Sequence, residues 1–360
     1  MTISFTPHIQ RLPDTVPFIG PETLERNNKK PFIARLGANE SAFGISPRAQ
    51  AAISGAISRE GCSWYGDPEN FELRSLLSDK HKVSMDNICV DAGIDSLLGL
   101  CVRLFISPVD VVVTSRGAYP TVNYHVSGYA GTLRTVPYLD NHEDPIALAE
   151  AANDHGARLV YLSNPDNPMG TCLEPEAIAT LLNKLPDNCL LLLDEAYVDF
   201  MTTMPVLALD VQDTRLIRFR TFSKAYGLAG MRIGYCLGHQ DIIAGFNRIR
   251  NHFAVNKLAQ IAAAASLLDD TFLPGVVEKV NEGRNRIYAL ATRLGLSYVP
   301  SSTNFVTVNI GSATKAEAML ESLADVGVFV RKPGMAPHDQ YVRFGVGTAQ
   351  EHQCLEDALI

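Results

Sequence analysis

Three features are scarce in this 360-residue sequence: paired cysteines, basic charge and long apolar runs. The seven cysteines are scattered, without a CxxC pair or a His/Cys ligand spacing, which indicates reduced thiols and no metal site. A formal net charge of −8 disfavours nucleic acid and anionic membranes as partners and leaves small molecules. No apolar run reaches transmembrane length, and the N-terminal segment lacks the basic-then-apolar layout of a signal peptide. We therefore expect a cytoplasmic protein that binds small molecules.

The composition and length are typical of a two-domain globular protein. Hydrophobic residues make up 46% of the chain and charged residues 19%, and the chain is long enough for two domains. Five prolines within residues 1–35 predict an extended arm that packs on another part of the protein or on a second subunit. Residues 36–245 are expected to form a large α/β domain, and residues 246–360 a smaller α+β domain.

Strands and helices are expected to alternate between residues 87 and 245, which indicates βα units around a mainly parallel sheet. Continuous apolar runs such as 189–193 are typical of strands that helices cover on both faces. After residue 245 the alternation ends, and the Ala- and Leu-rich stretch 242–268 predicts one long helix. The expected strands are 87–90, 110–114, 158–162, 189–193, 215–220 and 232–237, then 303–309, 327–331 and 341–346. The expected helices include 47–57, 94–105, 175–185, 276–294 and 314–326.

The most informative motif is TFSKAYGLAGMR at residues 221–232. Lys224 follows an expected strand, at the strand end where open α/β sheets bind ligands. An amine held there can form a Schiff base with an aldehyde. The hydroxyls of Thr221 and Ser223, together with Arg232, can bind a phosphate on the same ligand. The alternative is that Lys224 is a solvated lysine and Arg232 a surface charge.

Weaker signals follow the neighbouring strands. A turn at Gly93 opens an expected helix, and the free backbone N–H groups of Ile94 and Asp95 favour an anion such as phosphate. Tyr119 can lie flat against an aromatic ring, although a loop tyrosine is more often a packing residue. Asn167 can donate its amide to a ring oxygen, although asparagine is also a common turn former.

Asp194 is a sharper signal, because it ends a strand of four leucines and a buried carboxylate is costly without a partner. A protonated heterocyclic nitrogen is such a partner, and Tyr197 can bond to the same ring. A structural network can also hold an aspartate at such a position. Together with Lys224, these side chains describe a site for a phosphorylated pyridine aldehyde, whose ring withdraws electrons from the substrate Cα.

Seven segments occur in an order that matches a known family. They are LGANESAFGISP, WYGDPENFELR, GIDSLLGL, LSNPDNPMGT, LLLDEAYVDF, RTFSKAYGLAGMRIGY and VRFGVGT. With them the chain, from about residue 36 to residue 348, resembles the class I/II aminotransferases of fold type I, which depend on pyridoxal 5′-phosphate (PLP). It is most similar to the histidinol-phosphate aminotransferase family. The resemblance implies a mainly parallel seven-stranded sheet sandwiched by helices, a smaller α+β domain, and a homodimer that functions in amino-acid biosynthesis.

The resemblance also implies a role for each candidate residue. Lys224 would carry the cofactor as a Schiff base and then move the proton at the substrate Cα. Asp194 would pair with the pyridine nitrogen, Asn167 and Tyr197 would bond to the ring hydroxyl, and Tyr119 would stack on the ring. The phosphate would be held by Gly93, Ile94, Asp95, Thr221, Ser223 and Arg232.

Further implications concern a second subunit and the substrate. Tyr65 would reach the phosphate of the neighbouring subunit's cofactor, so that a homodimer shares its active sites. Arg343 would clamp a substrate carboxylate. Arg331 resembles a family arginine near the substrate, alongside Asn167, but it could equally be a rim charge. Phe18 stands where the family often has a tyrosine that binds the substrate phosphate, and it lacks the hydroxyl.

Smaller departures from the family pattern also bear on the substrate. The family's NNPTG is DNPMG here, its Gly-Ala-Asp-Glu turn is Gly-Ile-Asp-Ser, and the usual Pro-Thr before the stacking aromatic is Gly117-Ala118. The cofactor contacts survive these changes because the turn uses backbone groups. Recognition of histidinol phosphate stays open at this point.

Several functions fit these motifs to different degrees. The first is an aminotransferase that moves an amino group between a donor, such as histidinol phosphate or an aromatic amino acid, and a 2-oxo acid such as 2-oxoglutarate. The second is a decarboxylase of the threonine-phosphate type on the same scaffold, which differs in the bond that breaks. A PLP-binding sensor of a transcription regulator ranks last, because it needs a DNA-binding segment and a basic face. The remaining alternative is a Rossmann-like protein that binds no PLP, which would require that Lys224, Asp194, Asn167 and Arg232 occur in this pattern by coincidence.

Overall fold

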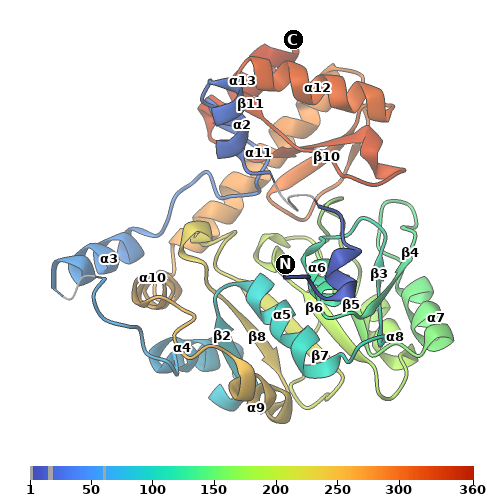
Figure 1. Ribbon diagram of the computed structural model, residues 1–360. Coiled ribbons are helices and arrows are strands. Elements are labelled where there is room, and N and C mark those ends of the chain that lie inside the picture. Colours follow the sequence, from blue (N-terminus) through green and yellow to red (C-terminus); the bar gives the residue numbers. More distant parts are fainter. Residues whose placement is uncertain (1–2, 15–18, 60–61) are drawn as a thin grey trace.

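The computed structural model describes residues 3–14, 19–59 and 62–360, and shows two groups of elements joined by a long helix (Figure 1). A seven-stranded sheet flanked by helices occupies the lower part of the view. A smaller group of strands and helices from the C-terminal part of the chain lies above it, together with α2 (Pro21–Asn28). The long helix, α11 (Phe272–Arg293), runs between the two groups.

The large sheet has the strand order β2-β8-β7-β6-β5-β3-β4. Strands β7, β6, β5, β3 and β4 are parallel to one another, and β8 is antiparallel to both of its neighbours. The mainly parallel seven-stranded sheet expected from the sequence is therefore confirmed. The strands are β2 (Ile88–Asp91), β3 (Val111–Ser115), β4 (Thr132–Val136), β5 (Leu159–Ser163), β6 (Leu190–Asp194), β7 (Leu216–Thr221) and β8 (Gly234–Gly238).

The leucine run of β6 shows why the sheet needs helices on both faces. Side chains alternate between the faces of a strand, so Leu190 and Leu192 lie in one apolar cluster and Leu191 and Leu193 in another. The first cluster includes residues of α5 (Ile94–Phe105), α6 (Thr121–Gly128) and α9 (Gln240–Ile249). The second includes residues of α7 (Pro145–His155) and α8 (Pro175–Lys184). Both faces of the strand are buried, which leaves its C-terminal end as the place for polar chemistry.

The prediction of one helix over residues 242–268 is wrong. Helix α9 ends at Ile249, and α10 (Lys257–Leu267) begins after a break. The backbone is extended at Arg250 and at Asn256, and the Asn256 side chain accepts a hydrogen bond from the Ala259 N–H at 2.9 Å. An asparagine that caps a helix in this way starts a new helix rather than continuing an old one.

The smaller group contains a three-stranded antiparallel sheet and a two-stranded pairing. The sheet order is β12-β10-β9, with β9 (Tyr298–Val299), β10 (Phe305–Asn309) and β12 (Tyr341–Gly345). The N-terminal strand β1 (Ala34–Arg35) pairs in parallel with β11 (Val328–Phe329). Ala34 and Leu36 lie in the same apolar cluster as Phe344. The segment that leads into the large sheet is thus anchored on the C-terminal elements; the domain limits near residues 35 and 245 stay predictions.

The remaining helices complete these layers. The N-terminal segment contains α1 in addition to α2, and α1 contacts α6 through the His8 Nε2 to Gly128 oxygen pair at 3.0 Å. The helices whose bounds have not yet been given are α1 (Pro7–Gln10), α3 (Pro47–Arg59), α4 (Phe71–His81), α12 (Ala313–Asp325) and α13 (Ala349–Leu359).

Candidate active site

A cavity of about 190 Å³ lies at the C-terminal ends of β5, β6 and β7 and the N-terminal end of α5. It brings together most of the residues expected from the sequence. Those that line it are Ile94, Asp95, Tyr119, Asn167, Asp194, Tyr197, Thr221, Ser223, Lys224, Arg232 and Arg343. The same cavity is also lined by residues to which the sequence assigned no role: Gly37, Ala38, Asn39, Ser163 and Ala196.

Lys224 is half-buried and presents its amine to this cavity. Its Nζ donates to the backbone oxygen of Asn39 at 3.1 Å and lies 5.6 Å from the centre of the Tyr197 ring. The turn that follows it closes through Gly227, whose N–H donates to the Lys224 oxygen at 3.0 Å. Gly227 has a φ of +72°, and a Cβ there would lie 1.9 Å from the Gly44 oxygen. Only glycine fits this position, so the turn fixes the lysine backbone.

Asp194 is buried at the end of β6 without a cationic partner among the described residues. Its Oδ2 accepts from the Tyr161 hydroxyl at 2.8 Å, and its Oδ1 accepts from the Ala196 N–H at 3.0 Å. Burial raises the pKa of this carboxyl to about 6, and the hydrogen bonds offset only part of that effect. A positive charge placed beside it would lower the pKa again. The site is therefore suited to a protonated ring nitrogen.

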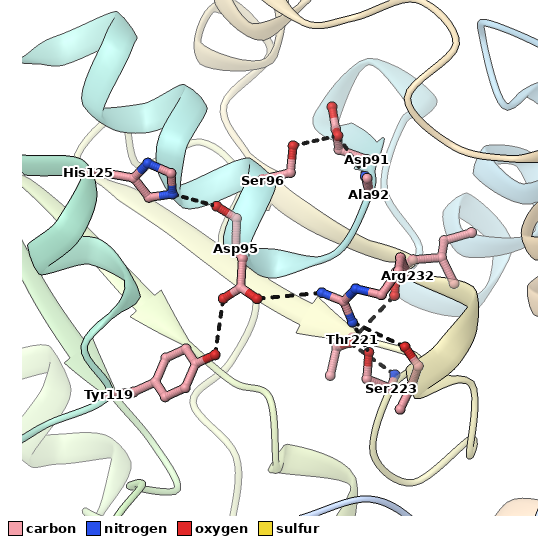
Figure 2. Close-up of polar contacts among 11 residues, drawn as sticks. Asp91, Ala92, Asp95, Ser96, Tyr119, His125, Thr221, Ser223 and Arg232 are labelled. Atoms are coloured by element: carbon pink, nitrogen blue, oxygen red, sulfur yellow. Dashed lines mark hydrogen bonds and ion pairs between the residues drawn. The ribbon is translucent and has the colours of Figure 1, made fainter. Parts of the chain in front are cut away.

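The N-terminus of α5 forms an anion cradle with the turn after β7. Gly93 precedes the helix with a φ of +90°, and a Cβ on it would lie 2.8 Å from Arg232 Nη2. Arg232 Nη1 lies 3.5 Å from Ser223 Oγ, and the Ser223 N–H donates to Thr221 Oγ1 at 3.0 Å. Figure 2 shows the guanidinium and both hydroxyl side chains close to the first turn of the helix. Free N–H groups, hydroxyls and a cation are the donors that phosphate requires.

Asp95 connects this cradle to Tyr119 (Figure 2). One carboxylate oxygen accepts from the Tyr119 hydroxyl at 3.2 Å, and the other lies 3.4 Å from Arg232 Nη2. The backbone oxygen of Asp95 pairs with His125 Nε2 at 3.1 Å. Burial raises the pKa of Tyr119, so its hydroxyl stays protonated and donates. The tyrosine ring expected to stack on a cofactor is thus held by a residue in the first turn of α5.

Arg343 supplies a second cationic group from β12. Its Nη1 donates to Asn167 Oδ1, its Nη2 donates to the Gly37 oxygen at 3.3 Å, and its guanidinium lies 5.0 Å from the Phe305 ring centre. Burial lowers its pKa, and its Nε has no hydrogen-bond partner among the described residues. No carboxylate of the described chain forms an ion pair with it. A substrate carboxylate would complete its coordination.

Two residues expected at the site lie elsewhere, and a third is not described by the structure. Arg331 does not line the cavity: its Nη2 donates to the Ile19 oxygen, its guanidinium lies 5.4 Å from the Phe329 ring, and burial lowers its pKa to about 10. Tyr65 is exposed on the surface, where it stacks on Phe253 with ring centres 4.4 Å apart. Phe18 falls outside the described residues. The roles of these residues therefore stay predictions.

Asn39 is the main site residue that sequence reasoning missed. Its Nδ2 donates to the Tyr197 hydroxyl at 2.8 Å, and its backbone oxygen accepts from both Lys224 and Asn304 Nδ2. It has a positive φ of 55°, a conformation that asparagine tolerates better than most residues. The only available signal was its place in the LGANESAF segment, because nothing in the sequence indicates that this loop lies over Lys224.

The described part of the chain shows neither a membrane-spanning helix nor a group of metal ligands. There, no helix is both long and apolar enough to cross a membrane. Within the same ranges, no three His, Cys, Asp or Glu side chains are grouped so that they could hold a metal ion.

Comparison with known proteins assigns the chain to a family. The sequence model for "Aminotransferase class I and II" matches residues 33–359. The chain is 33% identical over 344 residues to histidinol-phosphate aminotransferase 2 of Carboxydothermus hydrogenoformans, covering 94% of each chain. It is 36% identical over 331 residues to histidinol-phosphate aminotransferase 2 of Ralstonia nicotianae, covering 91% of this chain and 88% of the relative.

A solved structure gives the same result for the fold. The histidinol-phosphate aminotransferase of Sinorhizobium meliloti, determined in complex with pyridoxal-5′-phosphate, superimposes with a TM-score of 0.95 at 42% identity. The match covers 100% of this chain and 97% of that one. The family match over residues 33–359 includes the segments that carry Lys224 and Asp194. The chain therefore belongs to the class I and II aminotransferase family, and it is an enzyme of that family.

Proposed function

We propose that this enzyme is a PLP-dependent aminotransferase that takes an amino group from histidinol phosphate and passes it to a 2-oxo acid such as 2-oxoglutarate. The observation that carries the proposal is that Lys224 and Asp194 line one cavity with the anion cradle and with Arg343. The relatives that support the donor are named histidinol-phosphate aminotransferases. A 2-oxo acid as acceptor is supported by the guanidinium of Arg343, which lacks a carboxylate partner within the described ranges.

The residues present fit PLP. The cradle formed by the start of α5, Thr221, Ser223 and Arg232 would hold the phosphate, and Tyr119 would cover one face of the ring. Asp194, buried without a counter-ion in the described structure, would hold the proton on the ring nitrogen. When bound, PLP supplies an aldehyde that condenses with amines and a ring that draws electrons from the substrate Cα. No other cofactor is needed for an amino transfer.

The chain's own groups then account for the steps that a protein must supply. Lys224 would hold PLP through its amine, and that amine, once the substrate amine has replaced it, would move the proton at the substrate Cα. Its amine lies 5.6 Å from the centre of the Tyr197 ring, whose hydroxyl accepts from Asn39 Nδ2 at 2.8 Å. Tyr197 and Asn167 would bond to the ring hydroxyl. Arg343 holds the carboxylate of the oxo acid, so the acceptor is oriented for the return transfer.

We also propose a homodimer in the cytoplasm in which Tyr65 reaches the partner's phosphate cradle. Trp64, Tyr65, Phe71 and Phe253 are all exposed on this chain. Exposed aromatic groups of this size are common at interfaces between subunits. Light scattering should give twice the chain mass, and Tyr65→Ala should weaken PLP binding. A monomer that binds PLP with full affinity would contradict this part of the proposal.

The experiment that tests the activity follows the absorption spectrum of the PLP-loaded enzyme. Histidinol phosphate should convert the band of the bound aldehyde to that of the amine form, and 2-oxoglutarate should restore it. Lys224→Ala should show neither change, while Lys184→Ala, an exposed lysine at the end of α8, should behave as wild type. Conversion by aromatic amino acids alone would move the donor to that class. Carbon dioxide release from an amino acid phosphate, without conversion of the band, would replace transamination by decarboxylation.

A further inference from the structure

A second cavity, of about 310 Å³, lies beside α11 and shares no lining residue with the active site. One wall is helix α11, another is the loop that follows residue 200, and the third is the turn that precedes β10. The lining consists of Phe200, Thr202, Thr203, Asn281, Arg284, Asn285, Tyr288, Ser301 and Ser302. It contains one cation, six hydroxyl or amide side chains besides a tyrosine, and no acidic residue.

Arg284 is the unusual member of this lining. Its side chain is only 7% exposed. Nη1 donates to the Ser301 oxygen at 2.6 Å and to the Thr303 oxygen at 3.3 Å, and Nη2 donates to Asn281 Oδ1. These bonds engage three of the five N–H groups of a guanidinium. No carboxylate in the described part of the chain forms an ion pair with it.

Other arginines of this protein are paired with a carboxylate that neutralises their charge. Arg218, which is 1% exposed, donates to both carboxylate oxygens of Glu195. Arg286, two residues after Arg284 on the same helix, pairs with Glu356 at 2.5 Å. A buried charge without an opposite charge is costly, and burial lowers the pKa of Arg284 accordingly. Neutral carbonyl groups offset only part of that cost.

Uncommitted donors surround the guanidinium. Within the described residues, the Thr202, Thr203 and Asn285 side chains form no hydrogen bond of their own. Their hydroxyl and amide groups line the same space as Arg284. Hydroxyls, an amide and a guanidinium, with no acidic neighbour, are the set that binds a carboxylate or phosphate group.

We propose that this cavity is a second binding site, which takes a small oxyanion, a phosphate or carboxylate group, against Arg284. The anion supplies the missing negative charge, and the threonine and asparagine side chains bond to its remaining oxygens. Free phosphate and a small dicarboxylate share this chemistry, and they are distinguished by titrating each one separately.

The site also contacts the turn that carries Asn167. The Ser302 N–H donates to the Gly170 oxygen at 2.8 Å, and Ser301 Oγ would lie 2.7 Å from a Cβ placed on Gly170. Gly170 and Asn167 belong to the same turn, and Asn167 accepts from Arg343 in the active site. An anion on Arg284 therefore binds against a loop that packs directly on the active-site turn.

The test is a calorimetric titration of inorganic phosphate, and separately of malonate, into PLP-loaded enzyme whose Lys224 linkage has been fixed by borohydride. Fixing the cofactor keeps the phosphate cradle filled. Binding should persist in Arg343→Gln, which removes the active-site cation expected to bind a carboxylate. It should weaken by about tenfold or more in Arg284→Gln, the change expected for loss of a charge-assisted pair. Arg286→Gln is the matched control, because it removes a charge from the same helix that Glu356 already neutralises.

Arg284→Gln also removes the hydrogen bonds to the Ser301 and Thr303 oxygens, which can change the turn before β10. Two variants that keep these bonds therefore separate loss of the anion site from a change in the turn. Thr203→Val and Asn285→Leu leave every bond of Arg284 in place and remove only uncommitted groups of the cavity. Weaker binding in both, with unchanged thermal unfolding, supports the site. The proposal is overturned if neither anion binds the fixed wild-type enzyme, if binding is indifferent to Arg284, Thr203 and Asn285, or if it disappears with Arg343→Gln.

Discussion

The carboxylate of Asp95 lies 3.4 Å from the guanidinium of Arg232, within the cradle where the cofactor phosphate is expected. A negative side chain thus occupies part of an anion site. The backbone N–H of Asp95 favours a phosphate, whereas its side chain competes with the phosphate for Arg232. The other carboxylate oxygen accepts from Tyr119, so the residue also orients the expected stacking ring.

Asp95→Asn should therefore bind PLP more tightly, by a factor of roughly three to ten, because a like charge near the phosphate is removed and Arg232 is released. The asparagine oxygen can still accept from Tyr119. The dissociation constant of PLP from the apoenzyme measures this effect. Asp241→Asn, which changes an exposed acid in the first turn of α9, should have no effect. Weaker PLP binding by Asp95→Asn would show that the carboxylate assists the phosphate instead.

Asp194 should make the cofactor-free enzyme less stable as the pH rises. Its folded pKa of about 6 is above the ordinary value of 3.8, so between these values the folded state binds more protons than the unfolded state. The free energy of unfolding then falls with pH across this window. Asp194→Asn should remove the effect and stabilise the apoprotein at pH 7 by up to a few kcal/mol. Urea unfolding of both proteins at pH 4 and pH 7 measures it; an equal difference at both pH values would refute the prediction.

The two arginines that the sequence assigned to the substrate should differ in their effects. Arg343→Gln should raise the KM for the 2-oxo acid by roughly 100-fold, because a buried charge-assisted contact is worth about 2–3 kcal/mol. Arg331→Gln should change this KM much less, because Arg331 lies outside the cavity lining. Steady-state kinetics with each substrate varied in turn separate the cases. An Arg331→Gln enzyme whose KM rises only for histidinol phosphate would indicate that Arg331 binds the amino donor.

Gly93→Ala should weaken PLP binding and lower stability by roughly 1–2 kcal/mol. The φ of +90° is unfavourable for alanine, and the new methyl group would push against Arg232. Gly275→Ala in α11 is the matched control, because a Cβ there meets no atom within 4 Å and φ is not positive. That variant should be neutral or slightly more stable. Equal behaviour of the two variants would mean that Gly93 is not constrained by the cradle.

The strand-end residues could be predicted from sequence because each follows a buried strand directly. Asp194 and Lys224 lie at the same edge of the sheet for a local reason: β6 and β7 are neighbouring parallel strands. Asn39 could not be predicted in this way. It is placed by β1, which pairs with a strand nearly 300 residues away, and no local pattern encodes such a contact. The break before Asn256 was missed because an apolar periodicity does not reveal a capping asparagine that resets the helix.

The pairing of β1 with β11 has a consequence for biosynthesis on the ribosome. The strands of the large sheet, which end at Gly238, leave the ribosome well before residues 328–345 are made. Until then, β1 lacks its partner strand, so the loop with Asn39 lacks the anchor that the pairing with β11 provides. Residues 328–345 therefore complete a cavity for which Lys224 and Asp194 were made much earlier, and a nascent chain stalled before this stretch carries an unfinished active site.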